Sequence, residues 1–326
     1  MTSKSSTTSN NTSTHTSSIR ECAKTVPLLK YIVRRSREIK KVALLGPLWP
    51  IMRRTLMKAQ GMSLRKFAAT VLLKGEVVFD IGANNGETAL LMASCVGSSG
   101  HVCAFEPNPT LFARLSQCAT STFYRNLHAI PFALSDTIGT LTLLIDLRDG
   151  AGASTIVAQS AERETAWHGA SYKPTLVSAT TLDAFCDKYD RVPTFIKIDV
   201  EGAEEMVVRG GRKVIANHKP LIWFELWAGL DNGVQINQNL SHFKQLSEAG
   251  YAFFVASIFK VSNRWVPECD PANPAKLMPL DPEILEQLPV IGCDILAATP
   301  SQMERLHKCG LVSRRDAKSH ILGLSY

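Results

Sequence analysis

The chain has 326 residues, of which 45% are apolar and 20% are charged, with a net charge of +7. This balance is typical of a globular protein with one large domain or two small ones, and it argues against a wholly disordered chain. The charge is uneven, since residues 1–74 carry 15 Lys and Arg against two Asp and Glu, whereas residues 75–326 carry 21 against 27. A nucleic-acid-binding groove is therefore not expected on the larger, mildly acidic part.

The first 74 residues form two segments of different composition. Residues 1–19 are mostly Ser, Thr and Asn and are predicted to be disordered, because they contain almost nothing that can be buried. Residues 20–74 are basic and are predicted to be partly helical. Their apolar run, 42–52, contains one Gly and two Pro and is shorter than the roughly 20 residues that cross a bilayer. Peripheral membrane contact and packing against the main domain are both open interpretations of this extension.

The eight cysteines are spread along the chain, without a C-x-x-C pair or a histidine at ligand spacing. This pattern predicts neither a disulfide framework nor a zinc site, and it favours a reducing compartment. The first residues lack the basic start and apolar run of a secretory signal, so we expect a cytoplasmic protein. No coiled-coil heptad stands out, and the sequence predicts no particular oligomeric state.

From residue 75 onward, short apolar runs alternate with helical patterns. The predicted strands are residues 77–81, 101–105, 129–134, 140–145, 195–200, 221–226, 251–256 and 294–298. The predicted helices are residues 87–95, 109–119, 203–216, 240–249 and 301–307. Such alternation is typical of a doubly wound α/β fold, in which helices cover both faces of a mostly parallel sheet. We therefore predict one α/β domain over residues 75–310 and a C-terminal tail over residues 311–326.

The sharpest motif is an apolar strand that ends in Asp80 and runs into a loop with Gly82, Asn84 and Gly86. The two glycines let the backbone turn sharply and allow a ligand to come close. A dinucleotide pyrophosphate favours G-x-G-x-x-G without an adjacent carboxylate, but here Asn84 replaces the middle glycine and Asp80 is acidic. The carboxylate suits the ammonium and sulfonium groups of S-adenosylmethionine, so we predict this cofactor.

Two further acidic residues follow the next two strands. Glu106 lies about twenty residues after the loop, where a carboxylate typically accepts hydrogen bonds from both ribose hydroxyls. The alternative for Glu106 is a capping or surface carboxylate. Asp136 follows the third strand and either contacts the adenine amino group or forms an Asx-turn before Gly139. The residues leave these alternatives open.

A fourth segment places Lys197, Asp199 and Glu201 within five residues, just before Gly202 begins a helix. Charged side chains inside an apolar strand are unfavourable unless they form ion pairs or belong to a functional site. Asp199 and Glu201 are predicted at the carboxyl edge of the sheet, beside the cofactor loop. The alternative is a structural Lys–Asp pair followed by carboxylates that the helix dipole favours. We favour a functional site because perturbed charges gather at such sites.

These segments resemble the FkbM-type methyltransferases, a branch of the class I S-adenosylmethionine methyltransferases. The matching stretches, in chain order, are VVFDIGANNGETAL, AFEPNP, FALSD, GAGAS, TTLDAF, FIKIDVEGAEEMVVRGG and PLIWFEL, within residues 75 to about 228. The resemblance implies a seven-stranded sheet whose last strand, 294–298, is reversed. It also implies metal-independent O-methylation of sugars, polyketides or related metabolites. The residues implied to hold the cofactor are Asp80, Gly82, Asn84, Glu106 and Asp136.

Methyl transfer to an alcohol needs alignment and removal of a proton. Asp199 and Glu201 are the predicted catalytic residues, and we hypothesise that Asp199 positions or deprotonates a small-molecule or glycan hydroxyl. Other groups that could reach the acceptor are Glu204, Glu225 and His168. Residues 259–291, rich in proline, are the expected place for substrate contacts. The rival functions are a nicotinamide-dependent oxidoreductase and a non-catalytic cofactor-binding module.

Overall fold

The computed structural model describes twelve stretches of the chain. They are residues 64–120, 124–148, 153–158, 160–162, 165, 169–228, 230–231, 234–235, 240–261, 264–265, 277–287 and 291–312. By its contacts the chain divides into Met1–Pro50 and Ile51–Tyr326, and all described residues belong to the second unit. The predictions for residues 1–19, for most of the basic extension and for nearly all of the tail 311–326 lie outside the described residues.

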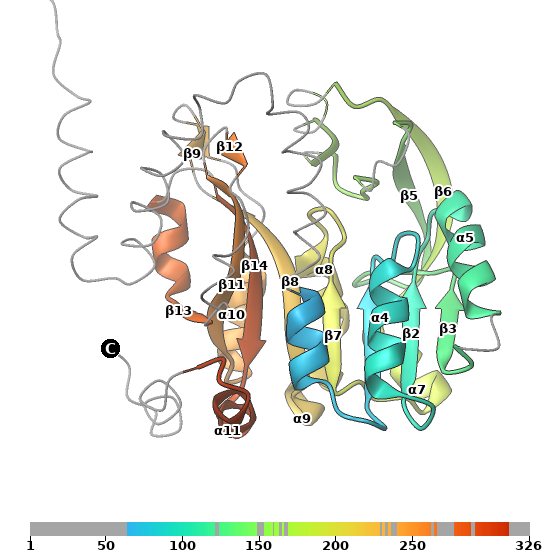
Figure 1. The fold of residues 1–326 in the computed structure, drawn as a ribbon. Coiled ribbons are helices and arrows are strands. Elements are labelled where there is room, and N and C mark those ends of the chain that lie inside the picture. Colours follow the sequence, from blue (N-terminus) through green and yellow to red (C-terminus); the bar gives the residue numbers. More distant parts are fainter. Residues whose placement is uncertain are drawn as a thin grey trace, which may run out of the picture. The chain divides into compact units, whose positions relative to one another are not determined.

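A large sheet forms the centre of the second unit (Figure 1). Its strands lie in the order β12-β11-β14-β8-β7-β1-β2-β3, and β13 pairs with β11. The main strands are β1 (Val77–Ile81), β2 (His101–Phe105), β3 (Leu127–Ile130), β7 (Phe195–Ile198), β8 (Leu221–Ala228), β11 (Ala252–Val261) and β14 (Ile291–Ala298). The short strands beside β11 are β12 (Arg264–Trp265) and β13 (Met278–Leu280).

The direction of the strands confirms the predicted fold class. Strands β3, β2, β1, β7 and β8 are parallel, whereas β14 runs antiparallel to both β8 and β11. The reversed strand is the one expected at residues 294–298, and it starts three residues earlier. The seven main strands therefore form the doubly wound sheet that the sequence predicted, and β12 and β13 extend it at one edge.

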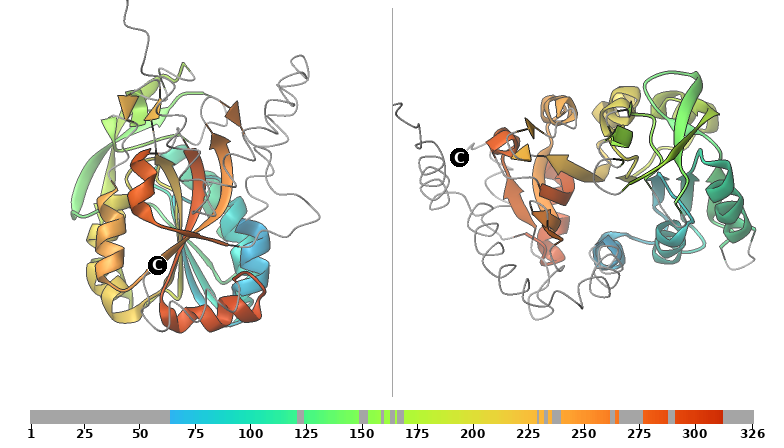
Figure 2. Two further views of the ribbon diagram at one scale, coloured as in Figure 1. Left: turned by 90° about the vertical axis from the view of Figure 1, so that its left-hand side faces the viewer. Right: turned by 90° about the horizontal axis from the view of Figure 1, so that it is seen from above.

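Helices cover both faces of this sheet (Figure 2). One face carries the helix over residues 64–71, α4 (Glu87–Val96), α5 (Pro109–Ala119) and α11 (Pro300–Lys308). The other face carries α7 (Leu182–Tyr189), α8 (Glu204–Gly210), α9 (Arg212–His218) and α10 (Ser241–Glu248). A 3₁₀ helix, η2 (Pro282–Gln287), precedes β14. Among the described residues, no helix is both long enough and apolar enough to span a membrane.

The helix over residues 64–71 belongs to the core, although the sequence placed it in the basic extension. Leu64, Phe67, Ala68 and Val71 are buried at the i, i+3, i+4 and i+7 spacing of an amphipathic helix. The ring of Phe67 lies 5.0 Å from that of Trp223 on β8, centroid to centroid. This end of the extension thus packs against the main sheet, one of the two interpretations left open.

A second, three-stranded sheet lies above β2 and β3 in Figure 1. It consists of β4 (Ala133–Leu134), β5 (Gly139–Asp146) and β6 (Tyr172–Thr180), with β6 in the middle. Ala133, Leu143, Val177 and Ala179 form its own small core. A two-stranded ribbon, β9 (Leu230–Asp231) with β10 (Val234–Gln235), follows β8.

Two predicted elements are each divided in the structure. The prediction of one continuous strand over residues 129–134 is wrong, because β3 ends at Ile130 and β4 pairs in the other sheet. Pro131 lies between them and has no N–H to continue a ladder. The helix expected at 203–216 is two helices that meet at Gly211, where a Cβ would lie 2.5 Å from the Leu182 side chain.

Candidate active site

A cavity of about 440 Å³ opens at the carboxyl ends of β1, β2 and β7. Its walls come from the loop after β1, the end of β2, strand β4 and the loop after β7. The three-stranded sheet and the segment beside it contribute Leu143, Ser154 and Ile156. In an open α/β sheet this is the edge where ligands bind, so the position alone marks the cavity as a candidate site.

The loop after β1 is shaped by its glycines and by Asn84. Gly82 has φ 79°, and a Cβ there would lie 1.8 Å from the Asp199 carbonyl oxygen. Asn84 also has a left-handed φ, 52°, and lines the cavity. Gly86, the N-cap of α4, faces Leu115 instead, because a Cβ there would lie 2.8 Å from that side chain. Gly82 and Asn84 thus shape the cavity wall, whereas Gly86 permits helix packing.

Glu106 follows β2 and points its carboxylate at the same loop. It is buried yet lines the cavity. One carboxylate oxygen accepts the N–H of Asn84 at 2.8 Å and the other accepts the N–H of Asn108 at 2.9 Å. Burial raises the pKa of Glu106, and these two hydrogen bonds oppose the rise. A carboxylate has about four acceptor positions, so each oxygen keeps capacity for a further donor such as a hydroxyl.

Asp80 and Lys197 form a buried ion pair across neighbouring strands. The two residues are directly opposite in the β1–β7 register, and Lys197 Nζ lies 3.2 Å from Asp80 Oδ1. Lys197 also lies 3.2 Å from Asp199 Oδ2 and donates to the Gly82 carbonyl at 2.9 Å. Asp80 is fully buried and does not line the cavity, so its carboxylate faces Lys197. Asp80 therefore contacts Lys197, and Lys197 in turn lines the cavity.

The pKa values in this pair follow from burial and from charge. Burial raises the pKa of Asp80, and the Lys197 ammonium opposes that rise. Burial alone would lower the pKa of Lys197, but Asp199 and Asp80 more than offset it, so the pKa lies above its ordinary value. Lys197 is thus a permanent positive charge between two acidic groups. The structural Lys–Asp pair that the sequence left as an alternative exists, and Asp199 reaches the cavity beside it.

Three carboxylates crowd together beside Lys197. Asp199, Glu201 and Glu225 each place an oxygen within 4.8 Å of the others. The Asp199 side chain is 38% exposed, and both Asp199 and Glu201 line the cavity. Burial, then the nearby Asp199 and Glu201, raise the pKa of Glu225 well above its usual range, which favours its protonated form. Among the described residues, this group is close enough to share a metal ion, although Lys197 already supplies a positive charge there.

Glu204, the first residue of α8, supports the loop after β7 from below. Its carboxylate is buried and accepts the N–H groups of Val200 and Gly202, each at 3.3 Å. Burial raises the pKa of Glu204 to about 7, and these hydrogen bonds oppose the rise. Glu204 does not line the cavity. It therefore holds the loop that carries Asp199 and Glu201 rather than contacting a ligand.

Asp136 takes part in a structural ion pair instead of lining the cavity. One carboxylate oxygen accepts hydrogen bonds from two nitrogens of the Arg209 side chain, Nε at 2.7 Å and Nη2. Beside this pair, a Cβ at Gly210 would lie only 2.0 Å from the Ser135 carbonyl oxygen. The FALSD and VRGG stretches thus pack against each other. The other carboxylate oxygen of Asp136 accepts the Ser135 hydroxyl at 3.1 Å, and the adenine contact of Asp136 stays a prediction.

Sequence reasoning missed the wall that faces the loop after β7. Leu143, Ser154 and Ile156 line it, and they are placed by β5 and β6. The available signals were the predicted strand at residues 140–145, which lies within β5, and the GAGAS stretch, which carried no chemistry of its own. His168 and just under half of residues 259–291 lie outside the described residues.

The family model for the methyltransferase FkbM domain matches residues 80–253, just over half of the chain. The chain belongs to the FkbM methyltransferase family. The predicted family is thereby confirmed, and with it S-adenosylmethionine as the cofactor. Within this FkbM methyltransferase the matched residues include every side chain of the carboxylate group beside Lys197.

Solved structures of other methyltransferases are similar to this chain at low identity. The methyltransferase FkbM from Methylobacillus flagellatus KT is 16% identical with a TM-score of 0.37, covering 69% of this chain and 44% of that one. The precorrin-6y C5,15-methyltransferase from Geobacter metallireducens GS-15 is 12% identical with a TM-score of 0.38, covering 74% and 89%. The O-methyltransferase from Thermotoga maritima is 14% identical with a TM-score of 0.35, covering 72% and 64%.

This chain spans less than half the length of the Methylobacillus protein. A search of curated proteins found no match. At such identities and TM-scores, the family assignment rests on the family model alone.

Proposed function

We propose that this FkbM methyltransferase transfers the methyl group of S-adenosylmethionine to a hydroxyl oxygen of a small-molecule or glycan acceptor, such as a sugar or a polyketide. One observation carries the proposal. A single cavity presents the Glu106 carboxylate, which has spare acceptor capacity, and the Asp199 carboxylate, which is partly exposed. The first suits a ribose diol, and the second suits the hydroxyl of an acceptor.

The charge of the cavity supports a cationic donor. Among the described residues, four carboxylates line it, those of Glu87, Glu106, Asp199 and Glu201, against the one ammonium of Lys197. An excess of negative charge attracts a sulfonium, and the low local dielectric strengthens that attraction. A pyrophosphate would be repelled by the same groups. The donor supplies an already activated methyl group, so alignment and proton removal are left to the protein.

Apolar side chains from several elements give the cavity a surface for a flat ring. Leu111 lies in α5, Phe132 precedes β4, and Ile156 follows Thr155. These residues line the same cavity as Glu106, which we propose binds the ribose hydroxyls. Aromatic and aliphatic surface is favourable for an adenine base because such rings bury apolar area on binding. We therefore propose that the adenosine part lies on this side and the acceptor on the Asp199 side.

Asp199 is the proposed group that positions and deprotonates the acceptor. Lys197, 3.2 Å from its Oδ2, holds the carboxylate in place. Asp199 lines the cavity, where an acceptor hydroxyl can donate to its other oxygen. Glu201 is the second candidate for the same role, since its carboxylate oxygen lies within 4.8 Å of that of Asp199. The proposed chemistry uses no metal.

The test is methyl transfer by the variant Asp199→Asn, measured with a radiolabelled methyl donor over a panel of hydroxylated sugars and polyketide alcohols. We expect turnover to fall by about 10² to 10⁴, the usual contribution of a positioned base, with unchanged binding of S-adenosylhomocysteine. The control is Asp187→Asn, an exposed carboxylate on α7. Unchanged turnover in Asp199→Asn with intact binding would reject the role of Asp199. EDTA is expected to leave the wild-type rate unchanged, and a loss that Mg²⁺ restores would contradict the metal-free chemistry.

A further inference from the structure

A hydrogen bond joins the three-stranded sheet to the loop after β7. Thr155 Oγ1 donates to the backbone carbonyl of Glu201 at 2.8 Å, across 46 positions of sequence. Thr155 is almost completely buried, and its hydroxyl also accepts the N–H of Val157 at 3.0 Å. Nothing in the GAGAS stretch suggested this link, because Thr155 is the residue that follows it.

The Glu201 backbone has a conformation that needs such support. Its φ is 54°, in the left-handed region that side chains other than Gly, Asn and Asp seldom adopt. A residue of this kind persists only where its surroundings hold it, often at functional sites. Glu204 holds the flanking N–H groups of Val200 and Gly202 from below. Thr155 holds the Glu201 carbonyl itself.

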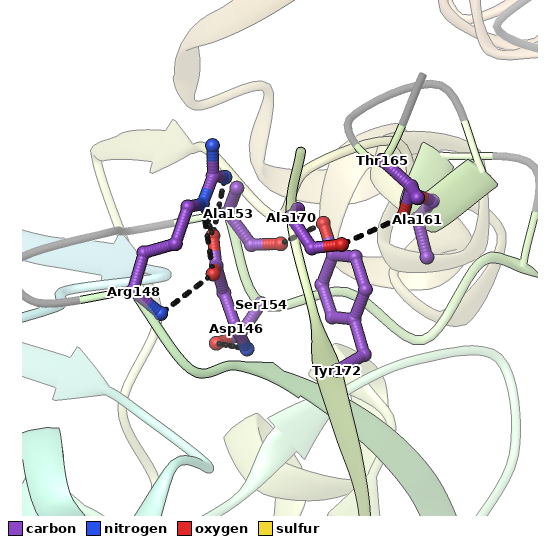
Figure 3. A network of polar contacts seen from close by, with 8 residues as sticks. All are labelled: Asp146, Arg148, Ala153, Ser154, Ala161, Thr165, Ala170 and Tyr172. Atoms are coloured by element: carbon purple, nitrogen blue, oxygen red, sulfur yellow. Dashed lines mark hydrogen bonds and ion pairs between the residues drawn. The ribbon is translucent and has the colours of Figure 1, made fainter. Parts of the chain in front are cut away.

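Hydrogen bonds hold the segment that carries Thr155, and Figure 3 shows those of the two preceding residues, Ala153 and Ser154. Thr155 and Leu144 exchange backbone hydrogen bonds of 3.1 and 2.8 Å, which attach the segment to the edge of β5. The Tyr172 hydroxyl donates to the Ala153 carbonyl at 3.3 Å, and Ser154 Oγ accepts the N–H of Asp146 at 3.2 Å. Thr155 is therefore a fixed point from which the Glu201 loop can be placed.

We propose that Thr155 is a positioning residue for methyl transfer, whose hydroxyl holds the Glu201 carbonyl so that the Glu201 carboxylate stays beside Asp199. The inference rests on the proposed function, in which Asp199 and Glu201 face the acceptor. It gives the three-stranded sheet a role, because β5 sets the position of Thr155 while its neighbours Ser154 and Ile156 line the same cavity. The wall that meets the acceptor thus also aligns the carboxylates.

The variants Thr155→Val and Thr155→Ser separate the hydroxyl from the packing. Valine keeps the volume but can neither donate to Glu201 nor accept from Val157, whereas serine keeps the hydroxyl. We expect Thr155→Val to lower kcat by about ten- to a hundredfold, the effect of a misplaced group near the reacting atoms. KM for the donor and binding of S-adenosylhomocysteine should change by no more than about twofold, because Glu106 and its loop are untouched. Thr155→Ser should retain most of kcat, and Thr142→Val, an exposed change on β5, should behave as wild type.

A merely structural role would lower the unfolding temperature and donor binding together and leave kcat per folded molecule unchanged, which would overturn the proposal. Where Thr155→Val does not fold, Thr155→Cys replaces it, since its weak S–H donor predicts a kcat below that of Thr155→Ser. Equal kcat in the cysteine and serine variants would also overturn it.

Crystal structures of wild type and Thr155→Val with S-adenosylhomocysteine give a readout that needs no acceptor. We expect Glu201 to leave the left-handed region and its carboxylate to move away from Asp199 in the variant. An unchanged Glu201 would overturn the role of Thr155 whatever the kinetics. If the wild-type chain methylates no acceptor but Glu201 is displaced in the variant, the proposed function is refuted. The same result would still support the contact by which Thr155 holds Glu201 in place.

Discussion

Replacing Lys197 with Met removes the one positive charge that separates Asp80 from Asp199. Lys197 Nζ lies 3.2 Å from an oxygen of each carboxylate and donates to the Gly82 carbonyl. Asp80 is fully buried, and no other hydrogen-bond donor reaches its carboxylate among the described residues. The variant therefore leaves a buried carboxylate without its counter-charge.

The expected loss of stability follows from these distances. At 3.2 Å and an effective dielectric of about 20, each pair is attractive by roughly 5 kcal/mol before desolvation is counted. Removing one partner of a buried pair typically destabilises a protein by about 3–5 kcal/mol, because the other charge stays buried. This is a large fraction of the roughly 5–15 kcal/mol by which domains are stable. Thermal and urea unfolding of Lys197→Met should both show this loss of stability.

A double-mutant cycle with Asp80→Asn isolates the pair. The amide introduced by Asp80→Asn carries no charge, so this change combined with Lys197→Met should give a protein more stable than Lys197→Met alone, by about 1–3 kcal/mol. The control is Lys188→Met, an exposed change on α7 that should stay within about 0.5 kcal/mol of wild type. A double variant no more stable than Lys197→Met would refute the reasoning, as would a Lys197→Met protein as stable as wild type.

The pH dependence has a definite sign. Burial raises the pKa of Asp80 in the folded state, and Lys197→Met removes the ammonium that opposes the rise. A carboxyl group with a raised pKa keeps its proton in the folded state at pH values where the unfolded chain has lost it. Stability then falls as pH rises from the unfolded pKa through the folded one. The gap between wild type and Lys197→Met should therefore widen as pH rises above 3.8, the ordinary pKa of an aspartate, and a gap that narrows would contradict the account.

Three further predictions concern the parts around the site. Glu106→Gln should weaken S-adenosylhomocysteine binding about tenfold or more in calorimetry, since an amide nitrogen cannot accept a ribose hydroxyl, and equal affinity would remove Glu106 from the cofactor site. Gly210→Ala should lower stability by at least about 1–3 kcal/mol in urea unfolding, because its Cβ would meet the Ser135 carbonyl at 2.0 Å; a neutral effect would contradict that packing. The pKa of Glu204 is raised to about 7, so this residue destabilises the fold as pH rises toward that value. Glu204→Gln should therefore flatten the pH dependence of the unfolding free energy, and an unchanged slope would contradict this role of Glu204.

The central strands could be predicted from the sequence because their signals are local and strong. Residues 77–81 and 101–105 are strands as predicted, and 109–119 is a helix with Asn108 as its N-cap, whose side chain accepts the Thr110 N–H at 3.0 Å. Buried parallel strands are nearly continuous apolar runs, and caps mark where helices begin. The cofactor loop and Glu106 follow from the order of these elements.

Of the three-stranded sheet, only β5 was predicted, at residues 140–145, and the other two strands could not be predicted in the same way. Strand β6 contains Pro174, which argues against a strand in sequence reasoning, and β4 has only two residues. Because this sheet holds Thr155 beside the Glu201 carbonyl, the acceptor side of the cavity depends on pairings that no local pattern reveals. Asp136 illustrates the same limit, since its partner Arg209 lies 73 positions away.

Isothermal titration of the wild-type chain with S-adenosylhomocysteine, and separately with NAD⁺, tests most directly whether the cavity after β1, β2 and β7 is a methyl-donor site. The account predicts saturable one-to-one binding of S-adenosylhomocysteine, weakened in Glu106→Gln, and no heat with NAD⁺. A folded chain, verified by circular dichroism, that binds NAD⁺ or leaves S-adenosylhomocysteine unbound would contradict it.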